Sequence, residues 1–355
     1  MSARPTVRID GSGIAAAALA LFCSRRGFAV TRGCAVEAAG PRVVAIPEDT
    51  AHLLSSLAGV DIERELLHRR IVRRRVAWDS RVFEEVPARV LVVDAAALTQ
   101  VLREKADAAA GDAASVSEHE PHDWWFSSHR GEEGVHYALA GSRVALTGWI
   151  SELPGFDEGA THVAAVPQGW LFAAPRPSGG IVINAVIAAN QRDQGSLLEQ
   201  AVRFVWPAAG KPQTGSGLIP CAPRLALARA ETGPIPLGEN ALFLDPLRGD
   251  GVGHAIRGAW LAHALVESVA NGGISREQSE SHYFRRLAAV FARHLDACLQ
   301  HYRNSWNASC WTGEIRSMQA CAVRISAPLP RFRLNCNRLE PEPSFNPRDN
   351  RRSGT

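Results

Sequence analysis

Residues 6–16 read Thr-Val-Arg-Ile-Asp-Gly-Ser-Gly-Ile-Ala-Ala, a short apolar segment that runs directly into a glycine-rich turn. Thr6–Asp10 is typical of a strand, and the Ala/Leu-rich stretch after the turn predicts a helix that ends near Gly27. Phe28–Arg32 predicts a second strand. Strand, glycine turn, helix and strand in this order indicate the first βαβ unit of a dinucleotide-binding fold.

The turn carries small residues at the three positions that such folds require, Gly11, Gly13 and Ala16. Gly11 permits a tight turn, and Gly13 lets the backbone approach a pyrophosphate. Ala16 permits close packing of the helix on the strand, and the N-terminus of the helix faces the phosphate charge. These three residues are therefore predicted cofactor contacts.

The end of the second expected strand departs from this pattern. Dinucleotide-binding folds usually place an acid there, on the ribose of the cofactor. Here Arg32-Gly33-Cys34 occupies the position, and Glu37 follows a few residues late. The sequence therefore leaves the adenosine half of the site undefined.

A second glycine-rich turn lies near the C-terminal side, where residues 238–255 read Gly-Glu-Asn-Ala-Leu-Phe-Leu-Asp-Pro-Leu-Arg-Gly-Asp-Gly-Val-Gly-His-Ala. A helix is expected directly after Gly253 and as far as about Ala270. Such a turn supplies backbone amides and the positive end of a helix dipole, which suit the N1/O2 edge of an anionic reduced flavin. The alternative is a glycine-rich start of a helix without a ligand.

This second turn resembles the end of the flavin domain in FAD-dependent monooxygenases of the para-hydroxybenzoate hydroxylase type, including their tryptophan-halogenase-like branch. That superfamily has Gly-Asp-Ala-Ala, then Asp-Pro, a glycine-rich turn and a long helix. Gly238-Glu239-Asn-Ala is similar to the first piece with Glu for Asp, and Asp245-Pro246 with Gly249 resembles the second. Weaker matches extend the resemblance over about residues 5–315.

The resemblance implies an FAD cofactor and a set of contacts to it. Glu239 would contact the ribityl or pyrophosphate part of FAD. The residues that would lie beside the isoalloxazine ring are Pro246, Gly249, Gly251, Val252 and Gly253.

Three side chains are candidates for the chemistry, and each has a plainer alternative. His254 begins the helix that would face the ring, where the helix dipole lowers its pKa; it is either a proton donor or acceptor or a helix-start residue bonded to the backbone. Asp245 is either a general base towards an indole or phenol or a cap of its turn. Trp170 is either a stacking surface for an aromatic substrate or a buried sheet residue. No metal site is expected.

Further weak matches favour one branch of the superfamily. Trp170-Leu-Phe172-Ala-Ala-Pro175 resembles the halogenase signature Trp-x-Trp-x-Ile-Pro with two replacements. Residues 302–311 resemble the end of the helical region in flavoproteins that hydroxylate a protein-bound tryptophan during cysteine tryptophylquinone biogenesis. Halogenases use a lysine in the region that corresponds to about residues 70–85, where this sequence has none. The resemblance therefore implies hydroxylation through a flavin C4a-hydroperoxide rather than halogenation.

The expected function is that of an FAD-dependent monooxygenase that hydroxylates an aromatic ring, an indole or tryptophan that is free or peptide-bound. Its expected partners are this aromatic substrate, carried by a peptide or small protein, and a flavin reductase or NAD(P)H as the electron source. No nucleic-acid or membrane partner is expected. Two alternatives stay open: a flavin-dependent reductase or dehydrogenase on the same fold, and a non-catalytic flavoprotein-like binding module.

Composition agrees with a globular protein of about two domains. The chain has 355 residues, of which 46% are hydrophobic and 21% charged, and a formal net charge of +3 that demands no nucleic-acid partner. Its seven cysteines are scattered and fit neither a disulfide framework nor a zinc site. The longest uncharged apolar run near the start, Ile14–Cys23, is too short to span a bilayer, and a cytoplasmic location is expected.

The expected fold class is α/β: a discontinuous Rossmann-like FAD domain, a mixed β-sheet substrate domain and C-terminal helices. The FAD domain is predicted at residues 1–68, 88–150 and 225–273, the substrate domain at 69–87 and 151–224, a helical segment at 274–327 and an extended tail at 328–355.

Local signals add detail to this division. Arg69–Val76 and Arg81–Val86 predict paired strands, and Val90–Val93 predicts a further one. The arginines of the first of these strands are interpreted mainly as a solvated face, with docking of an acidic peptide as the alternative. Ser275 and Gln278 predict a capping box for a long C-terminal helix. Trp124-Trp125 is interpreted as an exposed contact patch.

Overall fold

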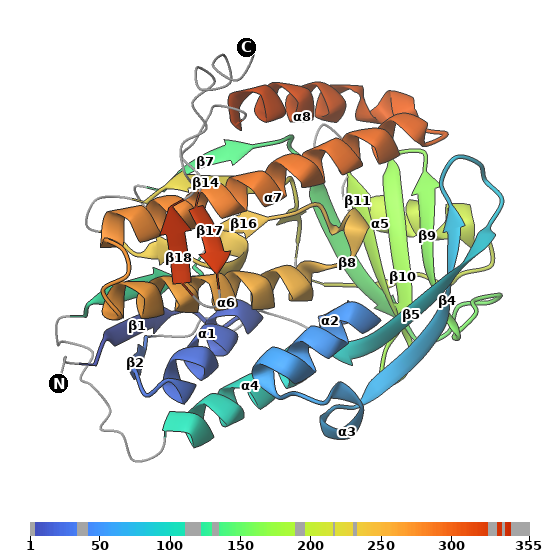
Figure 1. The fold of residues 1–355 in the computed structure, drawn as a ribbon. Coiled ribbons are helices and arrows are strands. Elements are labelled where there is room, and N and C mark those ends of the chain that lie inside the picture. The colour runs from blue at the N-terminus through green and yellow to red at the C-terminus, as the bar shows by residue number, and fades with distance from the viewer. Residues whose placement is uncertain are drawn as a thin grey trace, which may run out of the picture.

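The structure is a computed structural model of the chain (Figure 1). It describes residues 4–33, 42–110, 122–129, 135–188, 196–215, 217–229 and 233–325, and the backbone of 332–335 and 338–341. Cys34, Glu37 and Cys336, which the sequence analysis considered, lie outside these residues.

A small parallel sheet forms the base of the molecule. Its strands, in spatial order, are β15 (Ile235–Pro236), β6 (Trp124–Ser127), β1 (Thr6–Asp10) and β2 (Ala29–Arg32). Helix α1 (Ile14–Arg25) connects β1 to β2, so the predicted βαβ unit is confirmed. The prediction of an exposed contact patch at Trp124-Trp125 is wrong. Trp124 is buried in β6, which pairs with β1 in the middle of this sheet.

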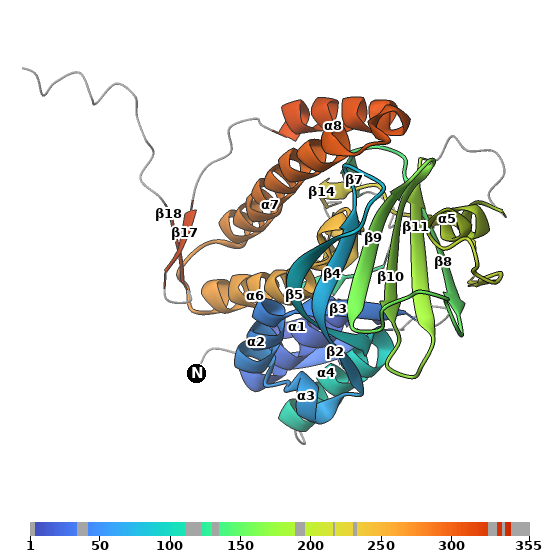
Figure 2. The same cartoon turned by 90° about the vertical axis from the view of Figure 1, so that its right-hand side faces the viewer.

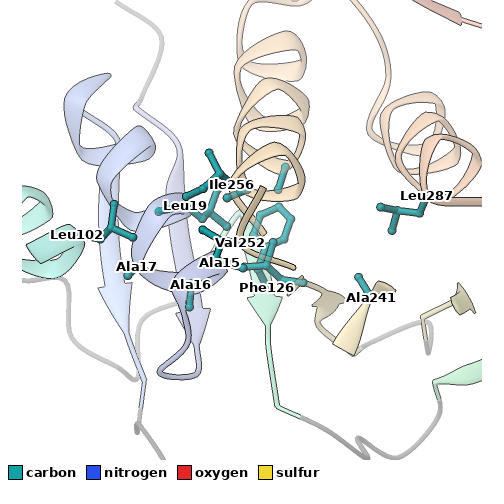
Figure 3. Close-up of a cluster of buried hydrophobic side chains, with 14 of the residues drawn as sticks. Ala15, Ala16, Ala17, Leu19, Leu102, Phe126, Ala241, Val252, Ile256 and Leu287 are labelled. Carbon is teal, nitrogen blue, oxygen red and sulfur yellow. The ribbon is translucent and has the colours of Figure 1, made fainter. Parts of the chain in front are cut away.

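Helix α1 packs closely against two other helices because its buried face is made largely of alanine. Helix α4 (Ala95–Ala110) lies on one side and α6 (Gly251–Ala270) on the other. Figure 3 shows Val252 and Ile256 of α6 beside Ala15 and Leu19 of α1. Small side chains let helix backbones approach one another, and this packing brings the N-terminus of α6 near the N-terminus of α1.

A large mixed sheet forms the other half of the molecule, curled as Figure 2 shows. In spatial order its strands are β12 (Gln213–Thr214), β8 (Val144–Ile150), β11 (Ile181–Ile187), β10 (Gly169–Pro175), β9 (Ala160–Val166), β4 (His68–Ala77), β5 (Glu84–Asp94) and β3 (Val43–Pro47), and β13 (Ile219–Pro220) also pairs with β8. The pair β4–β9 is parallel and the other pairs are antiparallel.

The two faces of this sheet have different neighbours. Leu171 and Ala173 of β10 pack beneath helix α5 (Leu197–Val205), on what we call the outer face. Trp170 and Phe172 point the other way, towards the core shared with α1, α6 and α7, and we call this side the inner face. Figure 2 shows α5 on one side of the sheet and helices α6 and α7 on the opposite side.

Two long helices close the fold at its C-terminal side. Helix α7 (Arg276–Asn304) begins with the predicted capping box, in which the Ser275 side chain and the Gln278 side chain each bond the other residue's backbone. Helix α8 (Thr312–Ile325) packs on α7. The small sheet beneath them comprises β16 (Leu242–Phe243), β14 (Arg224–Ala228) and β7 (His136–Leu139). The remaining helical pieces are α2 (Glu48–Leu53), the π-helical turn Leu54–Ala58, α3 (Ile62–Glu65), and the 3₁₀ turns Gly238–Asn240, Pro246–Arg248 and Ala308–Trp311.

The expected α/β class is confirmed, and one local expectation needs correction. The segment Val90–Val93 and the second half of Arg81–Val86 belong to one strand, β5, which begins at Glu84 and runs through Pro87, so residues 81–83 lie before the strand. Its second neighbour, β3, pairs only from Val90 onward, so Pro87 lies where β5 is an edge strand and a missing N–H is tolerated. The tail contains two extended strands that pair as a hairpin, β17 (Phe332–Asn335) and β18 (Arg338–Pro341).

The large sheet also includes β3 and β8 and most of β5, which the predicted division assigned to the FAD domain. The domain boundaries themselves stay a prediction. Within the described residues, no helix is long and apolar enough to cross a membrane.

Candidate active site

The turn between β1 and α1 requires glycine at one position and offers open space at the next. Gly11 has φ +119°, and a Cβ built on it would lie 2.0 Å from Ser128 Oγ, so no other residue fits there. At Gly13 a Cβ would meet no described atom within 4 Å. Gly13 is also the N-cap of α1 and makes no side-chain cap. The backbone here is therefore tightly fixed on one side and open on the other.

The start of α1 has the properties of an anion site. Its first turn contains no acidic residue, and its N-terminal amides have no side-chain cap. Arg103 of α4 donates from its guanidinium to the Ser12 carbonyl at 2.8 Å, which fixes the turn and adds a positive charge. Ala16 is 3% exposed and allows the close packing expected of it. The sequence analysis missed Arg103, because nothing local marks an arginine of α4 as a neighbour of the turn.

Asp10 fills the space at the end of β2. A Cβ built on Gly33 would lie 1.9 Å from Asp10 Oδ1, so Gly33 makes room for this carboxylate. The carboxylate accepts a hydrogen bond from Arg8 Nε at 3.1 Å and one from Trp125 Nε1 at 2.6 Å. An acid thus lies beside the β2 end although the β2 residue itself, Arg32, is basic and pairs with an acid on α4. The sequence signal that could have identified Asp10 is its position directly before the glycine turn.

The second glycine-rich segment contacts the first. Gly238 has φ +58°, and a Cβ built on it would lie 2.8 Å from the Cβ of Ala15, in the first turn of α1. The next residue, Glu239, forms an ion pair with Arg42 at 2.8 Å. The charge of Glu239 raises the pKa of Arg42. Two turns more than 200 positions apart therefore meet at one end of α1.

The loop before α6 is open at two of its glycines and filled at the third. Cβ atoms built on Gly249 and Gly251 would meet no described atom within 4 Å. At Gly253 a Cβ would lie 2.2 Å from Asp250 Oδ1 and 2.7 Å from Thr50 Oγ1. Pro246 is the first residue of the 3₁₀ turn, and Val252 is buried against α1. The N-cap residue of α6, Asp250, makes no side-chain cap to the first amides of the helix.

His254 lies in the first turn of α6 and is neutral near pH 7. Burial lowers its pKa below the ordinary value. Asp250 opposes this shift, while the charges of Arg257 and Arg248 act in the same direction as burial. The direction of this pKa shift is the expected one, but its main cause is burial and not the helix dipole. The side chain is 32% exposed, and its Nε2 lies 3.9 Å from Asp250 Oδ2.

Asp245 lies at the centre of a buried network rather than at an open surface. Its Oδ1 accepts from the Leu247 amide at 3.0 Å and caps the 3₁₀ turn. Its Oδ2 lies 3.1 Å from Arg143 Nε and accepts from the Tyr302 hydroxyl at 2.8 Å. Arg143 also donates to Glu314 of α8 at 2.6 Å. Both carboxylate oxygens of Asp245 thus have a partner inside the protein, which favours the capping interpretation of Asp245.

Trp170 joins the same network through Tyr302. We call Asp245, Arg143, Tyr302, Glu314 and Trp170 together the Asp245 network. The indole N–H of Trp170 donates to the Tyr302 hydroxyl at 3.1 Å, and the Trp170 side chain is 2% exposed. The sequence analysis missed the buried arginine and the tyrosine hydroxyl, because both partners of Asp245 are distant in the chain.

The accessible part of the inner face lies at the middle of its central strands. In β10 and β11 the half-buried residues are Phe172 and Asn184, and all others are buried. These two residues pair across the strands, and Asn184 pairs in turn with Thr147 of β8, whose hydroxyl donates to the Asn184 side chain at 2.8 Å. We call Phe172, Asn184 and Thr147 the central row. The apolar ring of Phe172 beside the amide of Asn184 and the hydroxyl of Thr147 suits an aromatic ligand.

Comparisons by sequence identify no relative: no protein-family model and no curated protein matches the chain. Comparison with solved structures does. The peptidyl tryptophan dihydroxylase QhpG, essential for tryptophylquinone cofactor biogenesis, has a TM-score of 0.71 at 16% identity, over 96% of this chain and 86% of its own. BrvH, a flavin-dependent halogenase from Brevundimonas, has a TM-score of 0.67 at 15% identity, over 92% of this chain and 82% of its own.

A p-nitrophenol 4-monooxygenase from Pseudomonas putida has a TM-score of 0.64 at 14% identity, over 91% of this chain and 98% of its own. The protein has the fold of FAD-dependent aromatic monooxygenases and halogenases. At these identities the likeness concerns the fold. Within the residues that the structure describes, no group of three or more His, Cys, Asp or Glu side chains is arranged to hold a metal ion.

Proposed function

We propose that the protein is an FAD-dependent monooxygenase that hydroxylates an aromatic substrate, an indole that is free or part of a peptide-bound tryptophan. The observation that carries this proposal is the contact of the two glycine turns. Gly238 lies against the start of α1, and open glycines stand on both turns, at Gly13 on one and at Gly249 and Gly251 on the other. A dinucleotide that extends from one helix N-terminus to the other fits this arrangement.

Residues of both turns would hold FAD. The first amides of α1 and the Arg103 guanidinium suit the pyrophosphate. Glu239, with Arg42 beside it, suits the hydroxyl groups of the ribityl or ribose part. The first amides of α6, near Gly251, suit the electron-rich edge of the flavin ring. When bound, FAD supplies the activation of dioxygen that ring hydroxylation needs.

The remaining work falls to side chains of this chain. The central row binds the aromatic ring by apolar contact at Phe172 and by hydrogen bonds at Asn184 and Thr147, and so orients it. Neutral His254 accepts a proton from the ring N–H or from a hydroxyl at Nδ1 or Nε2 during oxygen transfer. Asp245 keeps the turn in place through its bond to the Leu247 amide, and we assign it a positioning role.

The fold of a peptidyl tryptophan dihydroxylase supports an indole substrate and a role in modification of a protein, in quinone cofactor biogenesis. Electrons would come from NAD(P)H or a separate flavin reductase. The halogenases of the same fold do not extend the proposal to halogenation, because β4 and the loop after it contain arginines and no lysine.

Reconstitution with FAD tests the proposal. We expect a stoichiometric flavin spectrum and, with a reductant, indole substrates and ¹⁸O₂, a product that contains labelled oxygen. Gly13→Val serves as the cofactor-free control. Oxygen-independent turnover would indicate a reductase or dehydrogenase instead, and a protein that takes up no FAD would indicate a non-catalytic binding module.

A further inference from the structure

Arg74 points to the inner face of the large sheet. On β4, side chains alternate between faces, and Val76 pairs with Val163, which pairs with Phe172 of the inner face. Val76 and Arg74 are two residues apart and therefore share this face. In the parallel register with β9, Val76 pairs with Val163 and Arg74 pairs with Thr161.

The neighbouring arginine on the same strand points the other way. Arg75 pairs with His162 of β9, whose ring stacks on Phe156 at 4.4 Å and packs beside Trp206, near α5. The guanidinium of Arg75 lies 5.2 Å from the ring centroid of Phe83. Arg75 thus lies on the outer face beside aromatic rings; its Nε, like that of Arg74, has no hydrogen-bond partner among the described residues, so the two arginines differ in the face they occupy and in the rings around Arg75.

Arg74 has a charge without a described counter-charge. It is half-buried, its Nε is buried, and among the described residues no side chain or carbonyl accepts a hydrogen bond from it. Burial lowers its pKa, and no neighbouring carboxylate raises it again. A guanidinium stays protonated at any physiological pH, and a buried N–H of it that lacks a partner, here Nε, costs free energy. An anion bound there would offset that cost.

A second polar group beside Arg74 is also without a described partner. Thr161 is 1% exposed, and its Oγ1 is buried with no hydrogen-bond partner among the described residues. Because Arg74 and Thr161 are paired across β4 and β9, their side chains stand next to each other on one face. Together they provide a fork of N–H donors and a hydroxyl donor, which is the donor set that a carboxylate accepts from.

This pair lies within reach of the central row. Phe172 pairs with Val163, which pairs with Val76. The backbone of Arg74 therefore lies two strands across the sheet from Phe172 and two residues along the strand. That displacement is about 10 Å across and about 7 Å along the sheet, and the long arginine side chain shortens it. One aromatic molecule with a carboxylate on a short arm can contact both places.

We propose that Arg74 and Thr161 form a carboxylate subsite that selects aromatic substrates with a negative charge beside the ring. This inference rests on the proposed function, because it takes the central row as the place where the aromatic ring binds. The carboxylate belongs either to a small aromatic acid or to an acidic residue next to a peptide-bound tryptophan, since both present the same group to the guanidinium.

Binding of matched probes tests this subsite without relying on turnover. Calorimetric titration of the FAD-loaded protein compares indole-3-acetate with its neutral amide, indole-3-acetamide. A blocked tryptophan amide, with and without a preceding aspartate, forms the peptide arm. We expect the acid to bind about 10- to 100-fold tighter than its neutral partner in at least one arm, which is the range of a charge-assisted hydrogen bond. The arm with the larger ratio identifies the source of the carboxylate.

Variants assign this preference to residues. Arg74→Gln should remove the preference for the acid, and Thr161→Val should reduce it about 3- to 10-fold. Arg75→Gln, on the same strand but the outer face, should leave it unchanged. Equal binding of acid and neutral probe by the wild type, or a preference that survives Arg74→Gln, would overturn the subsite. The titrations are repeated on the protein without FAD, so a failure of cofactor binding is recorded separately from a failure of the subsite.

Discussion

Tyr302→Phe removes one oxygen atom from the Asp245 network and keeps the ring that fills the core. The hydroxyl donates to the Asp245 carboxylate at 2.8 Å and accepts from the Trp170 indole at 3.1 Å. A hydrogen bond to a charged group contributes about 1.5–3 kcal/mol, and a buried N–H left without a partner costs about 1–3 kcal/mol. These two effects overlap, so we expect the free energy of unfolding to fall by about 2–4 kcal/mol.

The chain offers a matched control on the same helix. Tyr283 is also fully buried in α7, and its hydroxyl donates to the neutral Pro236 carbonyl at 2.9 Å. Tyr283→Phe should cost about 1 kcal/mol, the typical value of a neutral hydrogen bond.

Equilibrium unfolding in urea measures both variants, with the midpoint expected to shift at an unchanged slope. A Tyr302→Phe protein no less stable than Tyr283→Phe would show that the carboxylate does not depend on this hydroxyl. The interpretation of the network as the support of the cofactor turn would then be refuted.

Three further predictions concern the turns and the buried histidines. Gly13→Val should abolish FAD binding and leave the melting temperature of the cofactor-free protein unchanged, because Gly13 has an extended backbone and open space around it. Gly11→Ala should lower that melting temperature, because the new side chain is strained at φ +119° and contacts Ser128. The ring nitrogens of His263 have no described partner, and burial lowers its pKa to about 4. The side chain therefore takes up a proton near pH 6.5 only in the unfolded state, so stability is lost as the pH falls from about 6.5 towards 4. Between pH 7 and pH 5, the unfolding free energy of His263→Phe should fall by about 2 kcal/mol less than that of the wild type. His254→Ala should retain the flavin spectrum and slow product formation by about 10²–10⁴-fold, and near-wild-type turnover would leave it as a helix-start residue.

Much of the cofactor side could be predicted because its signals are local. A glycine that must adopt a positive φ, a helix without an acidic first turn and a capping box are each encoded within a few residues. Gly11 and the capping box at Ser275 were predicted on that basis and are found as expected. The contact between Gly238 and Ala15 was implied only by resemblance to a known superfamily, since no local rule joins two distant turns.

The Asp245 network and the faces of the strands could not be predicted because their contacts cross the chain. Arg143 and Glu314 are 171 positions apart, and a single sequence with 36 acidic residues does not show which of them pairs with a given arginine. The sequence also did not show which face of the sheet each strand residue occupies. The arginines of β4 were interpreted mainly as a solvated face, but a bulge between Ile71 and Arg73 changes the alternation and turns Arg74 inward.

The position of Glu314 has a consequence for the order in which the protein matures. Every glycine of the two turns has been synthesised by residue 253, yet the Arg143 side chain that supports Asp245 also bonds Glu314, in α8. Chains emerge from the ribosome N-terminus first, at about 5–20 residues per second, so the support of Asp245 is completed only after Glu314 has emerged, more than 60 residues after the last glycine of the two turns. We therefore expect FAD to be acquired only after α8 has been synthesised. A message truncated after α7 would encode every glycine of the two turns and still yield a chain that loads FAD poorly.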